Sequence, residues 1–381
     1  MRRRLKECCS VIAGQSPASK YYNTIGEGLP FFQGKADFGN LYPSIRVFCS
    51  KPTKIAEKND ILLSVRAPVG PTNLAPCKVC IGRGLTAIRP SAELVTRYVL
   101  LFFKYYEGQL AAKGTGTTFK AITQDVVKNL EIPVPPLSEQ ERIVARIEEL
   151  FSQLDAGVET LKNTKAQLAV YRQAVLKEAF TGLSEKKPIR EMSSLVTSGS
   201  RGWAQYYADC GARFIRITDL TRNGIQLKKD SIQYVILPEK AEGKRSRLLD
   251  GDVLVSITAD LGSIALVPEN IDEAYINQHI AMIRFNNPSH GEFMAWYLRS
   301  EWGQKDLLKN KRGGGKLGLG LDDIRDTPVP VISDDTAQQI VAYINNRLSV
   351  CENIEKTMEN ALSQAEAMRQ SILKDVFEGS L

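Results

Sequence analysis

One stretch of helix-forming sequence occurs twice in this chain of 381 residues. "YRQAVLKEAFTG" (171–182) returns 197 positions later as "MRQSILKDVFEG" (368–379), and the surrounding copies share 14 identities in 40 aligned positions. Weaker matches precede both copies in the same order, namely "NDILLSVRAPVG" (59–70) with "GDVLVSITADLG" (251–262), "CIGRGLTAIR" (80–89) with "YINQHIAMIR" (275–284), and "IPVPPLS" (132–138) with "TPVPVIS" (327–333). Two unrelated amphipathic helices would not produce four colinear matches. The chain is therefore predicted to be a tandem duplication of a globular part followed by a long helix.

Each predicted helix is far longer than a usual core helix. No proline interrupts either copy before its terminal glycine, Gly182 or Gly379, and globular helices rarely exceed 25 residues. Apolar residues recur with a period near 3.5, which is typical of a coiled coil. The predicted seam consists of Ile143, Ile147, Leu150, Leu154, Leu161, Leu168, Val175, Ile340, Ile344, Ile354, Met358 and Ile372. Because each half ends in its helix, a pseudo-twofold arrangement would pair the two helices antiparallel, with a globular domain toward each end.

The composition is that of a folded protein. The apolar fraction is 43% and the charged fraction 24%, and no apolar run approaches the 18 residues of a membrane span. The seven cysteines are an odd number without framework spacing, which favours a reducing cytosol over a disulfide scaffold. We therefore expect a cytoplasmic protein with no membrane partner.

Positive charge is concentrated outside the helices. Residues 1–136 contain 19 Lys and Arg against 9 Asp and Glu, and residues 183–332 contain 21 against 19. The helical segments 137–182 and 333–381 are weakly acidic. Basic residues interleaved with Tyr, Trp, Asn and Gln are the pattern expected of nucleic-acid binding, although a solvated surface explains any single residue as well. The candidate DNA-binding residues are Lys20, Tyr21, Tyr22, Gln33, Lys35, Arg66, Lys113, Thr117, Lys120, Arg201, Trp203, Tyr206, Arg213, Arg216, Thr218, Arg222, Lys311, Arg312 and Lys316.

The sequence offers no convincing catalytic or metal-binding group. The two histidines lack spaced ligands, and "CKVC" (77–80) is a single CxxC pair. The glycine-rich loops 113–120 and 311–320 do not match GxxxxGK[ST], since Lys316 is followed by Leu317. We therefore predict a binding protein with no catalytic residues, no metal and no cofactor of its own.

The segment "FKAITQDVVKNLEIPVPPLSEQERIVARIEELFSQLDAGV" closely resembles the central conserved region of type I restriction–modification DNA specificity (S) subunits. "LKEAFTG" and "LKDVFEG" resemble that family's recurrent helix ends, and "GDVLVSITADLGSIALV", "YINQHIAMIR" and "SGSRGWAQYY" are similar to patterns of its target recognition domains. The joint resemblance covers essentially the whole chain.

The resemblance implies an α+β fold with a pseudo-twofold internal repeat, in which two globular target recognition domains are separated by two long antiparallel α-helices forming a coiled coil. The implied domains are target recognition domain 1 (1–136), a central conserved helix (137–182), target recognition domain 2 (183–332) and a C-terminal conserved helix (333–381).

The resemblance also implies a function in defence against foreign DNA. Each domain would read half of a bipartite, asymmetric site in double-stranded DNA, and the helices would act as a ruler and dock two methyltransferase subunits and, through them, restriction subunits. S-adenosylmethionine, ATP and Mg²⁺ would be bound by these partners, and the chain itself would be non-catalytic. Two alternatives remain open: a specificity protein with its own methyltransferase or nuclease activity, and a helical scaffold that binds protein.

Overall fold

The computed structural model describes residues 2–116, 120–228, 232–238, 242–309, 311 and 317–379. The chain divides into two compact units, which we call the first unit (Met1–Leu161 with Glu359–Leu381) and the second unit (Lys162–Met358). Each unit combines one globular part with portions of two long helices, α4 (Leu137–Ala179) and α9 (Asp334–Glu378). This division runs through both helices, so the domain boundaries derived from the sequence stay a prediction.

The globular part of the first unit contains a four-stranded antiparallel sheet and a five-stranded mixed sheet. The four-stranded sheet has the order β2 (Cys9–Ala13), β10 (Leu85–Pro90), β7 (Ile61–Ser64) and β8 (Thr72–Leu74). The five-stranded sheet has the order β3 (Tyr22–Asn23), β5 (Phe48–Cys49), β4 (Leu29–Phe32), β9 (Val79–Ile81) and β6 (Ile55–Ala56), with β4 and β9 parallel. Around these sheets lie β1 (Arg2–Arg4), which pairs with β11 (Glu131–Pro133), and the helices α1 (Leu5–Cys8), α2 (Thr96–Ala112) and α3 (Gln124–Lys128).

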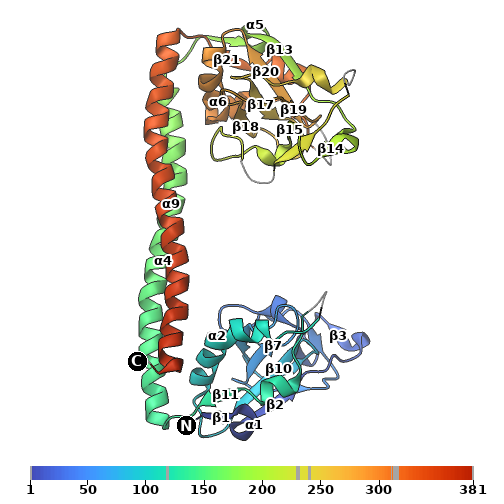
Figure 1. Cartoon of the computed structure of the whole chain (residues 1–381), viewed down its shortest axis with the longest axis vertical. Helices are drawn as coiled ribbons and strands as arrows, with labels where there is room; N and C mark the ends of the chain where they lie inside the picture. The colour runs from blue at the N-terminus through green and yellow to red at the C-terminus, as the bar shows by residue number, and fades with distance from the viewer. Residues whose placement is uncertain are drawn as a thin grey trace. The chain divides into compact units, whose positions relative to one another are not determined.

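The globular part of the second unit repeats this strand order for four strands of each sheet. One sheet has the order β13 (Ser193–Ser198), β20 (Ile280–Phe285), β17 (Val253–Ser256) and β18 (Ile264–Leu266). The other has the order β14 (Tyr207–Ala208), β16 (Gln233–Val235), β15 (Ala212–Ile215) and β19 (Ala274–Ile276), with β15 and β19 parallel. The remaining elements are β12 (Lys186–Pro188), which pairs with β21 (Pro328–Pro330), and the helices α5 (Ile189–Met192), α6 (Gly291–Arg299), α7 (Glu301–Leu307) and α8 (Leu321–Arg325), several of which are labelled in Figure 1.

Each globular part also contains an equivalent ion pair with a buried carboxylate. Arg89 of β10 donates to both carboxylate oxygens of Asp60 at 2.8 and 2.7 Å, and Arg284 of β20 donates to Asp252 at the same two distances. Both carboxylates are almost fully buried, which a charged group tolerates when it is paired and hydrogen-bonded. The shared strand order and the shared ion pair agree with the duplication predicted from the sequence.

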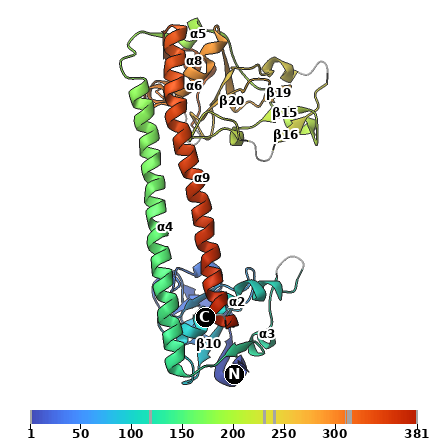
Figure 2. The same cartoon turned by 60° about the vertical axis from the view of Figure 1, so that its left-hand side comes forward.

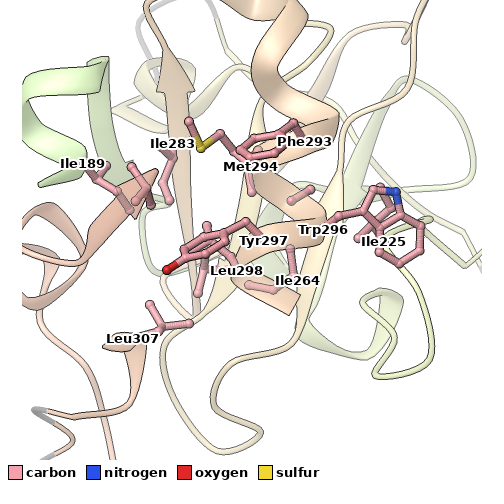
Figure 3. Close-up of a cluster of buried hydrophobic side chains, with 14 of the residues drawn as sticks. Ile189, Ile225, Ile264, Ile283, Phe293, Met294, Trp296, Tyr297, Leu298 and Leu307 are labelled. Atoms are coloured by element: carbon pink, nitrogen blue, oxygen red, sulfur yellow. The ribbon is translucent and has the colours of Figure 1, made fainter. Parts of the chain in front are cut away.

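Each globular part packs a helix onto its four-stranded sheet. In the second unit the apolar face of α6 supplies Phe293, Tyr297 and Leu298 to a core shared with Ile264 of β18 and Ile283 of β20 (Figure 3). In the first unit α2 has the same role, and its aromatic residues also reach the last turns of α9, which lie beside α2 in Figure 2. Burial of this apolar surface is the main stabilising contribution to each unit.

In the second unit, the portions of α4 and α9 run antiparallel. Arg172 of α4 pairs with Glu355 of α9 at 3.0 Å, and one helical turn or more further along α4, Glu178 accepts a hydrogen bond from Tyr343. The residue numbers of the contacting side chains therefore increase along α4 and decrease along α9, as in an antiparallel pair. In the first unit, the Arg369 guanidinium of α9 lies 5.0 Å from the Phe151 ring centre of α4. Both helices are followed by a glycine with positive φ, Gly182 and Gly379, as predicted for their C-terminal ends.

The predicted seam residues that recur every seven positions from Ile147 and from Ile344 belong to one column, which points inward. Its members are buried or half-buried, and they are Ile147, Leu154, Leu161, Leu168 and Val175 of α4 with Ile344, Cys351, Met358, Ala365 and Ile372 of α9. The predicted residues Ile143, Leu150 and Ile340 are half-buried.

The remaining seam residues form a second predicted column, and at Ile354 the inward position lies one residue later than predicted. Ile354 is 38% exposed, so its assignment to the seam is wrong, and the neighbouring Glu355 faces inward instead. Likewise Arg172 is buried whereas Tyr171 is 40% exposed. The column at Arg172 and Glu355 contains charged residues, and an apolar count of the sequence therefore missed it.

No helix within the described ranges is both long and apolar enough to cross a membrane.

Candidate nucleic-acid interface

A groove in the first unit collects polar side chains from three loops. Gln33 and Lys35 follow β4, Arg83 follows β9, and Arg66 follows β7, and all four line a cavity of about 820 Å³. Because β4 and β9 are parallel neighbours, their carboxyl ends meet at one edge of the sheet and bring these loops together. We call Gln33, Lys35, Arg66 and Arg83 the first-unit cluster.

The first-unit cluster is strongly positive. Lys35, Arg66 and Arg83 are exposed, and across the described ranges none of their charged groups lies within ion-pair distance of a carboxylate. The nearby Asp37 carboxylate instead accepts a hydrogen bond from the Gln33 backbone N–H at 3.0 Å and so holds the loop. Three unpaired cations around one groove provide an attractive site for phosphate groups.

The other candidates of the first unit lie at different places. Lys120 lies near this groove, since its carbonyl accepts a hydrogen bond from Ala67 N–H at 3.0 Å. Lys113 lies apart from it, over the Tyr106 ring and beside Arg2 and Arg4 in a separate cavity. Thr117 lies outside the described residues.

Two adjacent tyrosines have different roles. The Tyr21 ring is covered by the ammonium groups of Lys20 and Lys51, at 5.2 and 5.1 Å from its centre. Tyr22 instead packs on Phe31 and donates its hydroxyl proton to the Pro17 carbonyl, and burial raises the pKa of this hydroxyl. The hydroxyl of Tyr22 therefore serves the fold, whereas Lys20 and Tyr21 remain on the surface. Lys51 was not among the DNA-binding residues predicted from the sequence.

The equivalent loops of the second unit form a largely neutral cluster. Arg216 follows β15, Thr258 follows β17, and Gln278 and His279 follow β19. The Thr258 Oγ1 lies 2.6 Å from His279 Nδ1, and the Gln278 Nε2 lies 2.9 Å from His279 Nε2, so the three side chains are connected. We call Thr258, Gln278 and His279 the second-unit cluster. The predicted Thr218 lies beside it on the exposed turn Ile217–Asp219.

Sequence reasoning missed Arg83, Thr258, Gln278 and His279. The signal was available, because the matched segments "CIGRGLTAIR" and "YINQHIAMIR" align Arg83 with Gln278.

Several predicted residues of the second unit are engaged in the fold. Trp203 is buried, stacks on Phe214 and donates its indole N–H to Ser200 O at 2.7 Å, so its assignment as a surface DNA contact is wrong. The Tyr206 ring packs edge-to-face against the Trp203 ring. Arg213 donates to the Lys228 carbonyl, and Arg222 pairs with Asp260, whose pKa it lowers.

The remaining candidates of the second unit are exposed, half-buried or outside the described residues. Arg201 and Lys311 are exposed. Arg216 is half-buried, with its guanidinium 3.7 Å from Asp219. Arg312 and Lys316 lie outside the described residues. Within the described ranges, no three His, Cys, Asp or Glu residues are grouped to hold a metal ion.

Comparison with known proteins finds similarity to specificity subunits of type I restriction enzymes. The family model of the type I restriction modification DNA specificity domain matches residues 1–169. The putative type I restriction enzyme MjaX specificity subunit of Methanocaldococcus jannaschii is 41% identical over 173 residues, which is 45% of this chain and 40% of that protein. The EcoBI specificity subunit of Escherichia coli is 25% identical over 314 residues, 74% of this chain and 65% of that protein.

Among solved structures, the HsdS subunit from Thermoanaerobacter tengcongensis is 49% identical, with 41% of this chain and 38% of that chain covered and a TM-score of 0.39. The chain thus spans 40% and 65% of the length of the two curated relatives. Residues 1–169 thus match the type I restriction modification DNA specificity domain, and the longer similarity to the EcoBI subunit extends over 74% of the chain.

Proposed function

We propose that this chain is the DNA-binding specificity subunit of a type I restriction–modification complex and that each unit reads one half of a bipartite, asymmetric site. The main support is that equivalent loops of the two units carry two clusters of side chains suited to nucleic acid. Lys and Arg neutralise phosphates, and Arg and Gln can bind base edges through two hydrogen bonds.

The two clusters differ in chemistry, and we propose that the two half-sites differ accordingly. The arginines of the first-unit cluster suit the O6 and N7 acceptors of guanine. In the second-unit cluster, Gln278 suits the N6 and N7 edge of adenine, and the methyl group of Thr258 suits the methyl group of thymine. His279 contacts both side chains and so fixes their orientation.

We further propose that α4 and α9 form an antiparallel coiled coil that holds the two recognition domains apart and docks two methyltransferase subunits. Exposed apolar residues on the helices support such docking, since Val170, Val350 and Met368 are 71%, 54% and 53% exposed. The restriction subunits would join through the methyltransferases in the cytoplasm. In this proposal S-adenosylmethionine, ATP and Mg²⁺ belong to the partner subunits, and the chain itself performs no catalysis.

Salt dependence of DNA binding tests the role of the first-unit cluster. Fluorescence anisotropy of labelled duplex DNA, titrated with the full chain at increasing salt, gives the slope of log K against log salt concentration. Lys35→Gln should weaken binding and reduce this slope by about 1, as expected for loss of one phosphate contact. The matched control Arg142→Gln alters an exposed arginine on α4 that pairs with Glu139, and it should leave the slope unchanged.

Two results would contradict the proposal. A chain that binds duplex DNA without salt dependence, or not at all, would favour the protein-binding scaffold. Transfer of methyl groups to DNA by the purified chain with S-adenosylmethionine alone would favour a chain with its own methyltransferase activity.

A further inference from the structure

A small cavity in the second unit contains three guanidinium groups. Arg172 of α4, Arg222 after the turn Ile217–Asp219, and Arg299 at the end of α6 line a space of about 140 Å³. The cavity lies where the globular part contacts the portions of α4 and α9 that belong to this unit. Trp296, which reaches from α6 toward Ile225 in Figure 3, forms part of its wall.

Two of the three guanidinium groups already have acidic partners. Arg172 pairs with Glu355 at 3.0 Å and also donates to the Asn223 carbonyl at 3.2 Å. Arg222 pairs with Asp260 and donates to the Leu261 carbonyl at 3.2 Å. Arg299 has no carboxylate within ion-pair distance among the described residues, and burial together with Arg222 lowers its pKa. The cavity therefore contains one uncompensated positive charge.

Three buried N–H donors at this cavity also have no acceptor among the described residues. They are the Nε of Arg172, the Nε of Arg299 and the indole Nε1 of Trp296. Trp296 is 2% exposed and Arg172 is 9% exposed, so bulk water does not reach these donors freely. A buried donor without an acceptor is destabilising, and such groups are rare in folded proteins.

The first unit has a cavity at the equivalent place. It encloses about 310 Å³ and is lined by Lys35, Lys104, Arg369 and Gln370, among others. Arg369 and Gln370 follow Arg172 and Gln173 by the same 197 positions that separate the two repeats. Lys104 of α2 takes the place of Arg299 near the end of α6, since both lie on the helix that follows the equivalent strands β10 and β20.

Lys104, the cation of the first-unit cavity, is also partly removed from water. Burial lowers the pKa of Lys104, and Arg97 and Arg369 add to this effect. Its neighbour Glu107 is half-buried, and this burial raises the pKa of that carboxyl group, while Lys35 and Lys104 act to lower it. The Thr72 hydroxyl at this cavity is buried and has no hydrogen-bond partner in the described part of the chain. The two repeats have therefore kept a half-buried cation at the same place with different residues.

We propose that each unit binds one small tetrahedral oxyanion, phosphate or sulfate, in this cavity, where it joins the globular part to the helix pair. The oxyanion supplies the negative charge that Arg299 and Lys104 lack and accepts hydrogen bonds from the unpaired donors. The volume of about 140 Å³ equals that of roughly five waters at about 30 Å³ each, which fits a hydrated oxyanion and is too small for a nucleotide.

Isothermal titration calorimetry of the full chain with sodium phosphate, in the absence of DNA, tests this proposal. Sodium chloride at the same ionic strength is the reference titration, and sodium sulfate is the second ligand. The wild-type chain should bind phosphate at two sites. Arg299→Gln should lose one site and Lys104→Gln the other, each with at least a tenfold loss of affinity at the altered site.

Two further variants separate binding from folding. Trp296→Phe keeps an aromatic ring and removes only the N–H donor, so it should weaken one site while the far-UV circular dichroism spectrum stays that of wild type. Arg190→Gln removes an exposed guanidinium of the same unit, outside the cavity, and should leave both sites intact. The proposal is overturned if phosphate gives no more heat than chloride, or if Arg299→Gln and Trp296→Phe both retain two wild-type sites.

Discussion

The displaced heptad column predicts different stability effects for two residues of the same helix. Leu348 and Ile354 both lie on the second-unit portion of α9, yet Leu348 is 3% exposed and packs in the core around α6, whereas Ile354 is 38% exposed. Truncation of a buried leucine to alanine costs about 2–5 kcal/mol, from lost burial and the cavity left behind. We therefore expect Leu348→Ala to destabilise the second unit by about 3 kcal/mol.

Ile354→Ala should cost about 1 kcal/mol or less, because much of the side chain already faces solvent and alanine favours the helix by a few tenths of a kcal/mol. Urea unfolding followed by far-UV circular dichroism measures both losses, and comparable m-values ensure that the midpoints report stability. The two variants share a helix, a unit and nearly the same atoms removed, so each serves as the control for the other. Equal losses, or a larger loss for Ile354→Ala, would refute the inward column at Leu348 and Glu355.

Three further substitutions test individual contacts. Glu355→Gln removes the acidic partner of the buried Arg172 and should lower the free energy of unfolding by about 1–3 kcal/mol, whereas Glu139→Gln, in an exposed pair, should leave the urea midpoint unchanged. Gly199→Ala places a Cβ against the Ile276 carbonyl oxygen, so thermal unfolding should occur at a clearly lower temperature; an unchanged melting temperature would contradict this close approach. Gly157→Ala, in open space on α4, should instead stabilise the helix by about 0.5–1 kcal/mol in the same assay, and a loss of stability would mean that this face is covered.

The sequence predicted the long helices well because their signal is local and periodic. The absence of proline and a 3.5-residue apolar period identified one inward column, including Ile147 and Ile344, both fully buried. The second column was placed one residue too early because it contains Arg172 and Glu355, which an apolar pattern cannot recognise as buried. An ion pair between distant positions depends on the fold and leaves no periodic mark.

The candidate site was predicted in part, for a similar reason. Gln33, Lys35 and Arg66 lie far apart in sequence, yet the parallel pairing of β4 and β9 and the position of β7 bring them to one groove. Trp203 was misassigned because an aromatic residue in a polar loop has the same local sequence whether it is buried or exposed. His279 was overlooked because its two side-chain contacts come from the tertiary arrangement of the loops after β17 and β19.

The central claim is that the two units read separate half-sites, and selection of bound duplexes from a random DNA library tests it most directly. The full chain, purified with its partner subunits, should select two short conserved blocks separated by a spacer of fixed length. The double variant Arg66→Gln with Arg83→Gln should lose sequence preference in one block and keep the other block and the spacer unchanged. Selection of a single continuous motif by the wild type, or altered preference in both blocks in the variant, would contradict the account.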